Sequence, residues 1–282
     1  MSVKVDPSGR RWVQVEAEIP GTPEDVWQAI ATGPGISSWF VPTEFEAGPD
    51  GTPSKVISHF GPTPDMDSTA AITAWEPPHR FAAEAPMGIP DAPAFATEWV
   101  VEARSGGTCV VRVVHSFFAD SDEWDEQLTG TESGWPGFFR ILRLYVTHFR
   151  GQNCKILQLM AMSPAPEDEV WNALTSSLGV AGAQVGERRS AAGVGVPPLA
   201  GVVEWTGEGT GHHVVLLRLD EPGPGVLSLG AFFMGGQVCV VMNFYLYGEE
   251  APAIVERDQP LWQAWLAEHL PALAGAEEAT SV

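Results

Sequence analysis

The start of the chain alternates between apolar and polar residues in the manner of a β-strand. Between residues 11 and 19, apolar side chains take every second position from Val13 to Ile19, with polar residues between them. This period of two is typical of a strand with one buried face. Thr22 then suits a helix N-cap, and Pro23 suits the first helical position. The pattern predicts a strand followed by a helix.

Several strand-like segments and a long amphipathic helix follow. The segments lie near residues 43–46, 54–60, 68–76, 79–85, 94–103 and 108–118. The last two are joined by Arg104-Ser105-Gly106-Gly107, a hairpin signal. Apolar side chains then recur at helical spacing, at Phe138, Ile141, Leu142, Tyr145 and Phe149. This half therefore predicts about seven strands and a closing helix that lays one face on the sheet.

The second half repeats this plan. The phrase at residues 22–30, TPEDVWQAI, returns at 165–174 as APEDEVWNAL. A repeat on this scale indicates two copies of one domain, and 282 residues suit two domains. The second copy predicts a strand at 154–162, a helix at 166–176 without a polar N-cap, two hairpins over 201–220 and 226–247, and a helix near 256–270. We expect domains at 8–151 and 152–275, then a disordered tail at 276–282.

Composition and charge narrow the classes of partner. Asp plus Glu number 36 against 15 Lys plus Arg, a formal net charge of -21, which repels the phosphates of nucleic acid. Three cysteines without a C-x-x-C pair argue against a disulfide framework and a structural zinc site. The first residues lack the pattern of a signal peptide, and no apolar run reaches membrane-spanning length. We expect a cytoplasmic protein without membrane insertion.

The order of elements resembles the helix-grip fold of the SRPBCC (START-like) superfamily, in particular its heat-shock-protein ATPase activator (AHSA) branch. The resemblance covers roughly residues 10–150 and lies in residues 23–30, Ser38-Trp39-Phe40, residues 106–116 and Glu132-Ser133-Gly134-Trp135. The second half keeps only the repeated phrase and the final helix. The resemblance implies an α+β protein of two tandem helix-grip domains, each a curved antiparallel sheet wrapped around a long C-terminal helix.

The resemblance also implies a cavity between sheet and helix that binds a hydrophobic or amphipathic small molecule. Strand alternation directs Trp99 and His115 inward and Arg112 toward solvent. For any single tryptophan or histidine, ordinary core packing is the alternative. The candidate lining residues of the first domain are Trp39, His59, Trp75, Trp99, Val113, His115, Trp135, Phe138 and Leu142.

Motifs for catalysis are scarce. The sequence has no G-x-S-x-G, H-E-x-x-H or P-loop, and no G-x-G-x-x-G followed by a helix. His212 and His213 are neighbours in a predicted strand, so their side chains point to opposite faces and cannot share one metal unaided. We therefore expect no catalytic residue, metal or cofactor.

Two other functions stay open. An enzyme of the cyclase or hydratase kind would need two of His115, His59 and Arg112 to converge in one pocket. A chaperone-cofactor-like interaction protein would follow from the AHSA resemblance, although we expect this chain to lack the separate N-terminal client-contacting domain of the eukaryotic activator. The apolar hairpin at 226–247 can build an interdomain surface or a homodimer.

Overall fold

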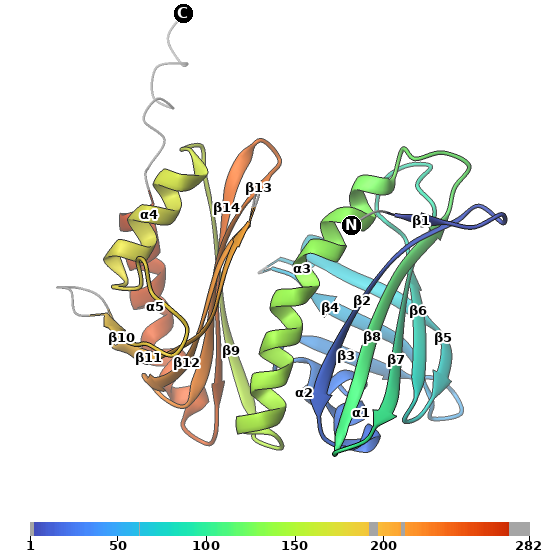
Figure 1. The fold of residues 1–282 in the computed structure, drawn as a ribbon, viewed down its shortest axis with the longest axis horizontal. Helices are drawn as coiled ribbons and strands as arrows, with labels where there is room; N and C mark the ends of the chain where they lie inside the picture. The colour runs from blue at the N-terminus through green and yellow to red at the C-terminus, as the bar shows by residue number, and fades with distance from the viewer. Residues whose placement is uncertain (1–2, 62, 192–196, 210–211, 271–282) are drawn as a thin grey trace, which may run out of the picture. The chain divides into compact units, whose positions relative to one another are not determined.

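The chain forms two compact units, Met1–Gly151 and Gln152–Val282. The structure is a computed structural model that describes residues 3–61, 63–191, 197–209 and 212–270 (Figure 1). The predicted tail at 276–282 lies outside the described residues. The described part of each unit holds one antiparallel sheet and a long helix near its C-terminal end. The predicted α+β class with helix-grip units is therefore confirmed.

The first unit carries an eight-stranded sheet with the strand order β1-β2-β8-β7-β6-β5-β4-β3. Its elements are β1 (Lys4–Val5), β2 (Arg10–Pro20), α1 (Pro23–Ile30), α2 (Gly33–Ile36), β3 (Thr43–Ala47), β4 (Pro53–His59), a 3-10 turn (Pro64–Met66), β5 (Asp67–Glu76), β6 (Arg80–Ala85), β7 (Phe95–Arg104), β8 (Thr108–Phe118), α3 (Asp125–Leu144) and a π-helical turn (Tyr145–Phe149). Figure 1 shows the sheet curving around α3.

Helix α1 begins where its sequence signals place it. The backbone N–H of Asp25 donates to Oγ1 of Thr22 over 3.2 Å, and the backbone N–H of Thr22 donates to Oδ2 of Asp25 over 3.1 Å. This reciprocal pair is a capping box, which satisfies two donors that a helix start would otherwise leave unpaired. Val26 and Ile30 are fully buried, so the capped helix seats an apolar face on the sheet.

Helix α3 is longer than its apolar spacing predicts. That spacing indicates a helix from Phe138, whereas α3 begins at Asp125. Gly130, Gly134 and Pro136 lie in the early part, and all three lower intrinsic helix propensity. Tertiary packing offsets this weakness, because Leu128 is fully buried within the same stretch.

The second unit has a six-stranded sheet of order β10-β11-β12-β13-β14-β9. Its elements are β9 (Cys154–Ser163), α4 (Glu167–Ser177), β10 (Arg188–Ala191), β11 (Leu199–Gly209), β12 (His212–Glu221), β13 (Gly225–Met234), β14 (Gln237–Tyr247) and α5 (Ala251–His269). Pro166 takes the N-cap position of α4 and supplies no side-chain cap, as the sequence predicts. In both units the first long strand pairs with the last: β2 with β8, and β9 with β14.

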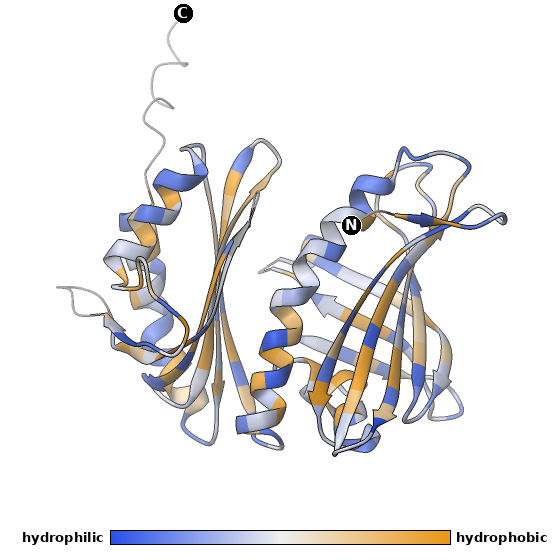
Figure 2. Ribbon diagram, viewed as in Figure 1, coloured by the Kyte–Doolittle hydropathy of each residue, from blue (hydrophilic) through white to orange (hydrophobic). Residues whose placement is uncertain are grey.

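Apolar residues recur along the strands of the first unit, with polar residues between them (Figure 2). On β8 the alternate residues from Cys109 to Phe117 are all buried, and Trp99 and Val101 are buried on β7. The predicted inward faces of both strands are therefore confirmed. The opposite face carries Arg112, which pairs with Glu16 and Glu102.

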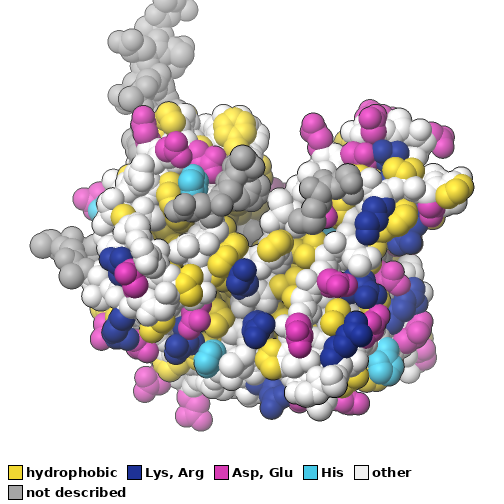
Figure 3. Space-filling model, in the orientation of Figure 1, with side chains coloured by type: hydrophobic (Ala, Val, Ile, Leu, Met, Phe, Trp, Pro, Cys, Tyr) yellow, Lys and Arg dark blue, Asp and Glu magenta, His cyan; other side chains and the backbone are white. Residues whose placement is uncertain are grey.

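The surface carries the acidity predicted from composition. On the face drawn in Figure 3, Asp and Glu side chains are scattered with Lys and Arg between them. Such a distribution suits the ordinary role of net charge in solubility. Within the described part of the chain, no helix is both long and apolar enough to cross a lipid bilayer.

Candidate functional site: a cavity between the sheet and helix α3

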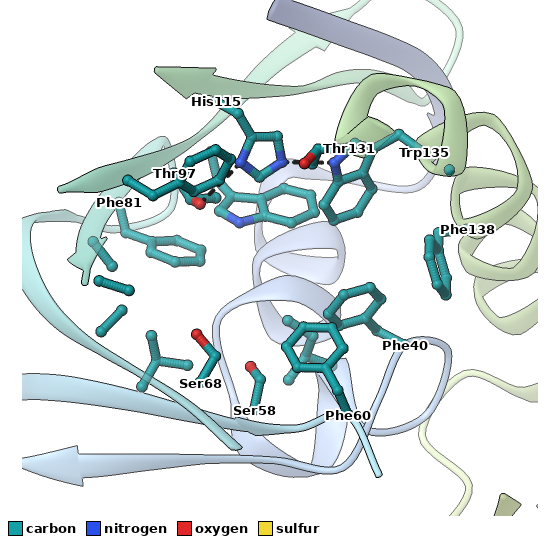
Figure 4. Close-up of a pocket in the computed structure, with 18 of the residues that line it drawn as sticks. Phe40, Ser58, Phe60, Ser68, Phe81, Thr97, His115, Thr131, Trp135 and Phe138 are labelled. Carbon is teal, nitrogen blue, oxygen red and sulfur yellow. Dashed lines mark hydrogen bonds between the residues drawn. The ribbon is translucent and has the colours of Figure 1, made fainter. Parts of the chain in front are cut away.

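A cavity of about 380 Å³ lies in the first unit between the sheet, α2 and α3 (Figure 4). Five strands and two helices supply its mostly apolar wall. The lining residues are Ile36, Phe40, Val56, Ser58, Phe60, Ser68, Ala70, Phe81, Ala83, Ala85, Phe95, Thr97, Trp99, His115, Gly130, Thr131, Gly134, Trp135 and Phe138. None of these described residues is Lys, Arg, Asp or Glu, so the lining brings no fixed charge to the cavity.

Strand register places four of the five polar residues of the lining in two cross-strand pairs; the fifth, Thr131, lies on α3. Thr97 of β7 lies directly opposite His115 of β8, and Ser58 of β4 lies directly opposite Ser68 of β5. Residues paired in this way on an antiparallel sheet lie on the same face, with their side chains close together. Figure 4 shows Thr97 and His115 on one side of the cavity and the two serines on the other.

Aromatic rings form much of the remaining wall. Phe40 of the segment after α2 stacks on Trp135 of α3, with ring centroids 5.4 Å apart, and meets Phe138 edge-on at 4.7 Å. Trp99 of β7 meets Trp135 edge-on at 5.0 Å. Such edge-to-face and offset contacts add to the stabilisation from burial. They also give the cavity firm, flat apolar walls.

Two glycines of α3 face the cavity. A Cβ atom at Gly130 would meet nothing within 4 Å, and a Cβ atom at Gly134 would meet only Phe138, at 3.9 Å. A glycine inside a helix costs roughly 1 kcal/mol relative to alanine. No steric need in the described structure accounts for that cost at either position. The missing side chains instead leave space open at the helix surface.

His115 is held between two hydrogen-bond partners. Its Nε2 atom lies 2.6 Å from Nε1 of Trp135, and its Nδ1 atom lies 3.0 Å from Oγ1 of Thr97. The side chain is buried, and desolvation lowers the pKa of His115 to about 3. The imidazole is therefore neutral near pH 7, and the Trp135 N–H occupies its lone pair.

Four of the nine predicted lining residues, Trp99, His115, Trp135 and Phe138, line this cavity. Three of the other five pack in the hydrophobic core. Trp39 is fully buried and donates its indole N–H to the carbonyl of Ala29 over 2.7 Å. Val113 and Leu142 are also fully buried and lie outside the lining. An inward direction thus does not by itself bring a side chain to the cavity.

His59 and Trp75 also lie outside the lining. His59 follows Ser58 on β4, so alternation turns it away from the cavity, and its Nδ1 atom lies 2.8 Å from Oδ1 of Asp67. The Trp75 ring packs edge-on against Trp27, with centroids 5.1 Å apart. His59 therefore serves a contact between β4 and β5, and Trp75 packs the sheet against α1; neither lines the cavity.

Sequence reasoning missed most of the polar groups and both glycines of the lining. Thr97 shares strand parity with Trp99, which is a usable signal for its inward direction. Gly130 and Gly134 stand four residues apart, a spacing that puts them on one side of a helix. That signal is readable only once the helix is known to start at Asp125.

The enzymatic reading that relies on His115, His59 and Arg112 is not supported by this geometry. Only His115 lines the cavity; His59 pairs with Asp67, and Arg112 pairs with acidic residues on the other face of the sheet. Among the described residues, no group of three or more His, Cys, Asp or Glu side chains could hold a metal ion.

Residues 10–146 match a protein-family model. Its description is "Polyketide cyclase / dehydrase and lipid transport", and the matched stretch contains every residue that lines the cavity. The match lies within the first unit. No curated protein matches the chain.

Some solved structures with a likeness match about half of this chain, and another matches nearly all of it. The di-domain ARO/CYC BexL from the BE-7585A biosynthetic pathway covers 93% of this chain and 99% of its own, at 13% identity and a TM-score of 0.42. CalU16 from Micromonospora echinospora covers 52% of this chain and 83% of its own, at 16% identity and a TM-score of 0.39. The match to the Aha1 dimer from Colwellia psychrerythraea covers 50% of this chain and 98% of the Aha1 chain, at 15% identity and a TM-score of 0.38. At these TM-scores, none of the three assigns a function to this chain.

Proposed function

We propose that the first unit binds a hydrophobic or amphipathic small molecule in the cavity between its sheet and helix α3. The cavity of about 380 Å³ carries this proposal, because ligand pockets are typically about 300–1,000 Å³ and mostly apolar with a few polar groups. Aromatic rings suit an apolar body, and the hydroxyls of Ser58, Ser68 and Thr97 suit polar substituents. The match of residues 10–146 to a family described by cyclase, dehydrase and lipid-transport roles also supports a small-molecule ligand.

Native mass spectrometry of protein purified without denaturation tests the proposal, together with calorimetric titration of a neutral apolar probe such as 2-ethylnaphthalene. We expect saturable binding with one probe per chain. Gly134→Leu places a side chain in the cavity and abolishes binding, whereas Thr129→Leu, on an exposed position of the same helix, leaves it unchanged. Absence of both a co-purified molecule and probe binding would overturn the proposal.

An enzyme of the cyclase or hydratase kind is the second candidate. It is favoured by hydroxyl groups gathered inside an apolar cavity and by the cyclase and dehydrase terms of the family description. His115 is a poor general base in this arrangement, since its pKa is lowered to about 3 and its Nε2 lone pair accepts from Trp135. Incubating a co-purified molecule with fresh protein separates the two functions. A molecule recovered with unchanged mass and unchanged chromatographic retention supports binding alone, because ring closure without loss of water would keep the mass and change the retention.

We propose that the second unit is a diverged copy of the same domain. The repeated Pro-Glu-Asp phrase opens both α1 and α4, and in each sheet the first long strand pairs with the last.

Membership of the AHSA branch, a cytoplasmic location and a homodimer through the 226–247 hairpin stay predictions. Phe233 and Met234 at the tip of that hairpin are exposed. Phe233→Ser with Met234→Ser, compared with the unmodified chain by analytical ultracentrifugation, tests the homodimer.

A further inference from the structure

The hydrogen bond between Trp135 and His115 fixes where the imidazole carries its proton. An indole nitrogen can only donate, so the contact of 2.6 Å requires Nε2 of His115 to accept. A neutral imidazole has one N–H, which therefore lies on Nδ1. Burial of the ring favours this neutral form.

The same logic fixes the direction of the next hydrogen bond. Nδ1–H of His115 donates to Oγ1 of Thr97 over 3.0 Å. The Thr97 hydroxyl keeps its own hydrogen, and within the described residues no protein acceptor is found for that hydrogen. Thr97 lines the cavity, so the free O–H is available to a molecule inside it (Figure 4).

We propose that Thr97 is a specificity-determining donor, oriented by Trp135 through His115, that binds a carbonyl-type oxygen of a neutral, largely apolar ligand. This inference rests on the proposed function of the cavity. His115 occupies one lone pair of the Thr97 oxygen and leaves the hydroxyl hydrogen unpaired. Such a donor discriminates between ligand groups, because an oxygen acceptor satisfies its hydrogen and an apolar group leaves that hydrogen unpaired.

The absence of fixed charge in the lining sets the charge of the ligand. An ionised carboxylate or ammonium placed among these described side chains would lose its hydration without gaining a counter-ion, which is costly. On the opposite wall, Oγ of Ser58 lies 3.3 Å from Oγ1 of Thr43, while the Ser68 hydroxyl can donate or accept. Thr131 of α3 donates its hydroxyl to the carbonyl of Gln127 and so offers a ligand only its lone pairs, whereas His115 leaves the Thr97 hydrogen available.

A matched pair of neutral probes tests the proposal on the full chain. 2-Acetylnaphthalene and 2-ethylnaphthalene differ by a carbonyl in place of a methylene, and calorimetric titration gives a Kd for each. We expect Thr97→Val, which removes the hydroxyl at nearly constant shape, to raise the Kd of the acetyl probe about 2- to 10-fold. The same substitution should not raise the Kd of the ethyl probe and should lower it to the extent that this probe leaves the hydroxyl unpaired. Thr97→Ser keeps the hydroxyl and is expected to keep the preference. An equal effect of Thr97→Val on both probes would overturn the inference.

Trp135→Phe tests the positioning role. Without the indole N–H, the imidazole can carry its proton on Nε2 and accept the Thr97 hydrogen at Nδ1, so the ratio of the two Kd values should move toward that of Thr97→Val. An unchanged ratio would show that Trp135 does not orient Thr97. Binding of neither probe to the unmodified chain is a different result, since it removes the proposed function itself.

The tautomer can be measured without any substitution. Nitrogen-15 NMR of histidine-labelled protein distinguishes a protonated from an unprotonated ring nitrogen. We expect His115 to show a proton on Nδ1 and none on Nε2. The reverse tautomer, or a doubly protonated ring at neutral pH, would refute the hydrogen-bond chain.

Discussion

The indole N–H of Trp135 donates to Nε2 of His115 over 2.6 Å and so joins helix α3 to strand β8 at the wall of the cavity. The two rings are inclined by 22°, and the Phe95 ring stacks on the imidazole with centroids 5.1 Å apart. Both ring nitrogens of His115 are thus engaged by protein atoms. The neutral imidazole therefore has a structural role, because it links α3 to β7 and β8.

The buried imidazole predicts a pH dependence of stability. Burial lowers the pKa of His115 to about 3, while an unfolded histidine titrates near about 6.5. Between these values the unfolded chain binds one more proton than the folded chain at this residue. Its contribution is complete above about pH 6.5 and is lost on acidification, by about 1.4 kcal/mol per pH unit.

Urea unfolding between pH 7 and pH 4 checks this dependence. We expect His115→Gln to lower stability at pH 7 and to flatten the fall on acidification. His79→Gln, at an exposed position of the same unit, controls for the loss of one histidine. Parallel curves for the unmodified chain and His115→Gln would contradict the prediction.

Two substitutions at Gly134 of α3 are expected to act separately on the stability of the protein and on ligand binding. Gly134→Ala is expected to raise the free energy of unfolding by up to about 1 kcal/mol, because alanine favours the helix and its Cβ meets only Phe138 at 3.9 Å. Gly134→Leu is expected to fold and to lose probe binding. Thermal unfolding and calorimetric titration measure the two effects; destabilisation by alanine would show that the glycine has a conformational role.

The cap of α1 predicts a local loss of stability. Thr22→Ala removes the hydroxyl that accepts from the backbone N–H of Asp25, and we expect a cost of about 0.5–2 kcal/mol. Thr22→Ser keeps the cap and should behave as the unmodified chain. Hydrogen exchange of the first amides of α1 measures the difference. Equal protection in both variants would mean that packing alone holds the helix start.

The buried thiols predict slow chemical modification. Cys109 and Cys239 are fully buried, and desolvation raises the pKa of both thiols above the usual range. At pH 8 we expect a disulfide reagent to react with these two cysteines only as fast as the chain unfolds. Their rates should rise sharply in urea. Fast reaction in native buffer would contradict the described burial.

Much of the first unit can be predicted from its sequence pattern. The expected strand at 108–118 coincides with β8, and alternation correctly turned Trp99 inward. Local chemistry also sufficed for the Thr22 cap. The pattern did not predict the first part of α3, because Gly130 and Pro136 disfavour a helix locally. Burial against the sheet offsets that preference.

The site was harder to predict than the fold, for a physical reason. Alternation predicts that Val113 and His115 lie on the same face of β8. It does not predict that neighbouring side chains cover Val113 completely while His115 borders the cavity. The importance of Thr97 depends on its register with His115 and on the indole beyond it. Those relations join residues from three elements, and no single segment of the sequence contains them.

The pairing of first and last strands has a consequence for how each unit folds. Residues 10–20 pair with residues 108–118 in the first sheet, and residues 154–163 pair with 237–247 in the second. Contacts between such distant parts of a chain slow folding, because the loop entropy is lost before the contacts form. During synthesis, β2 therefore lacks its partner β8, and β9 lacks its partner β14, until almost all of the unit has been made.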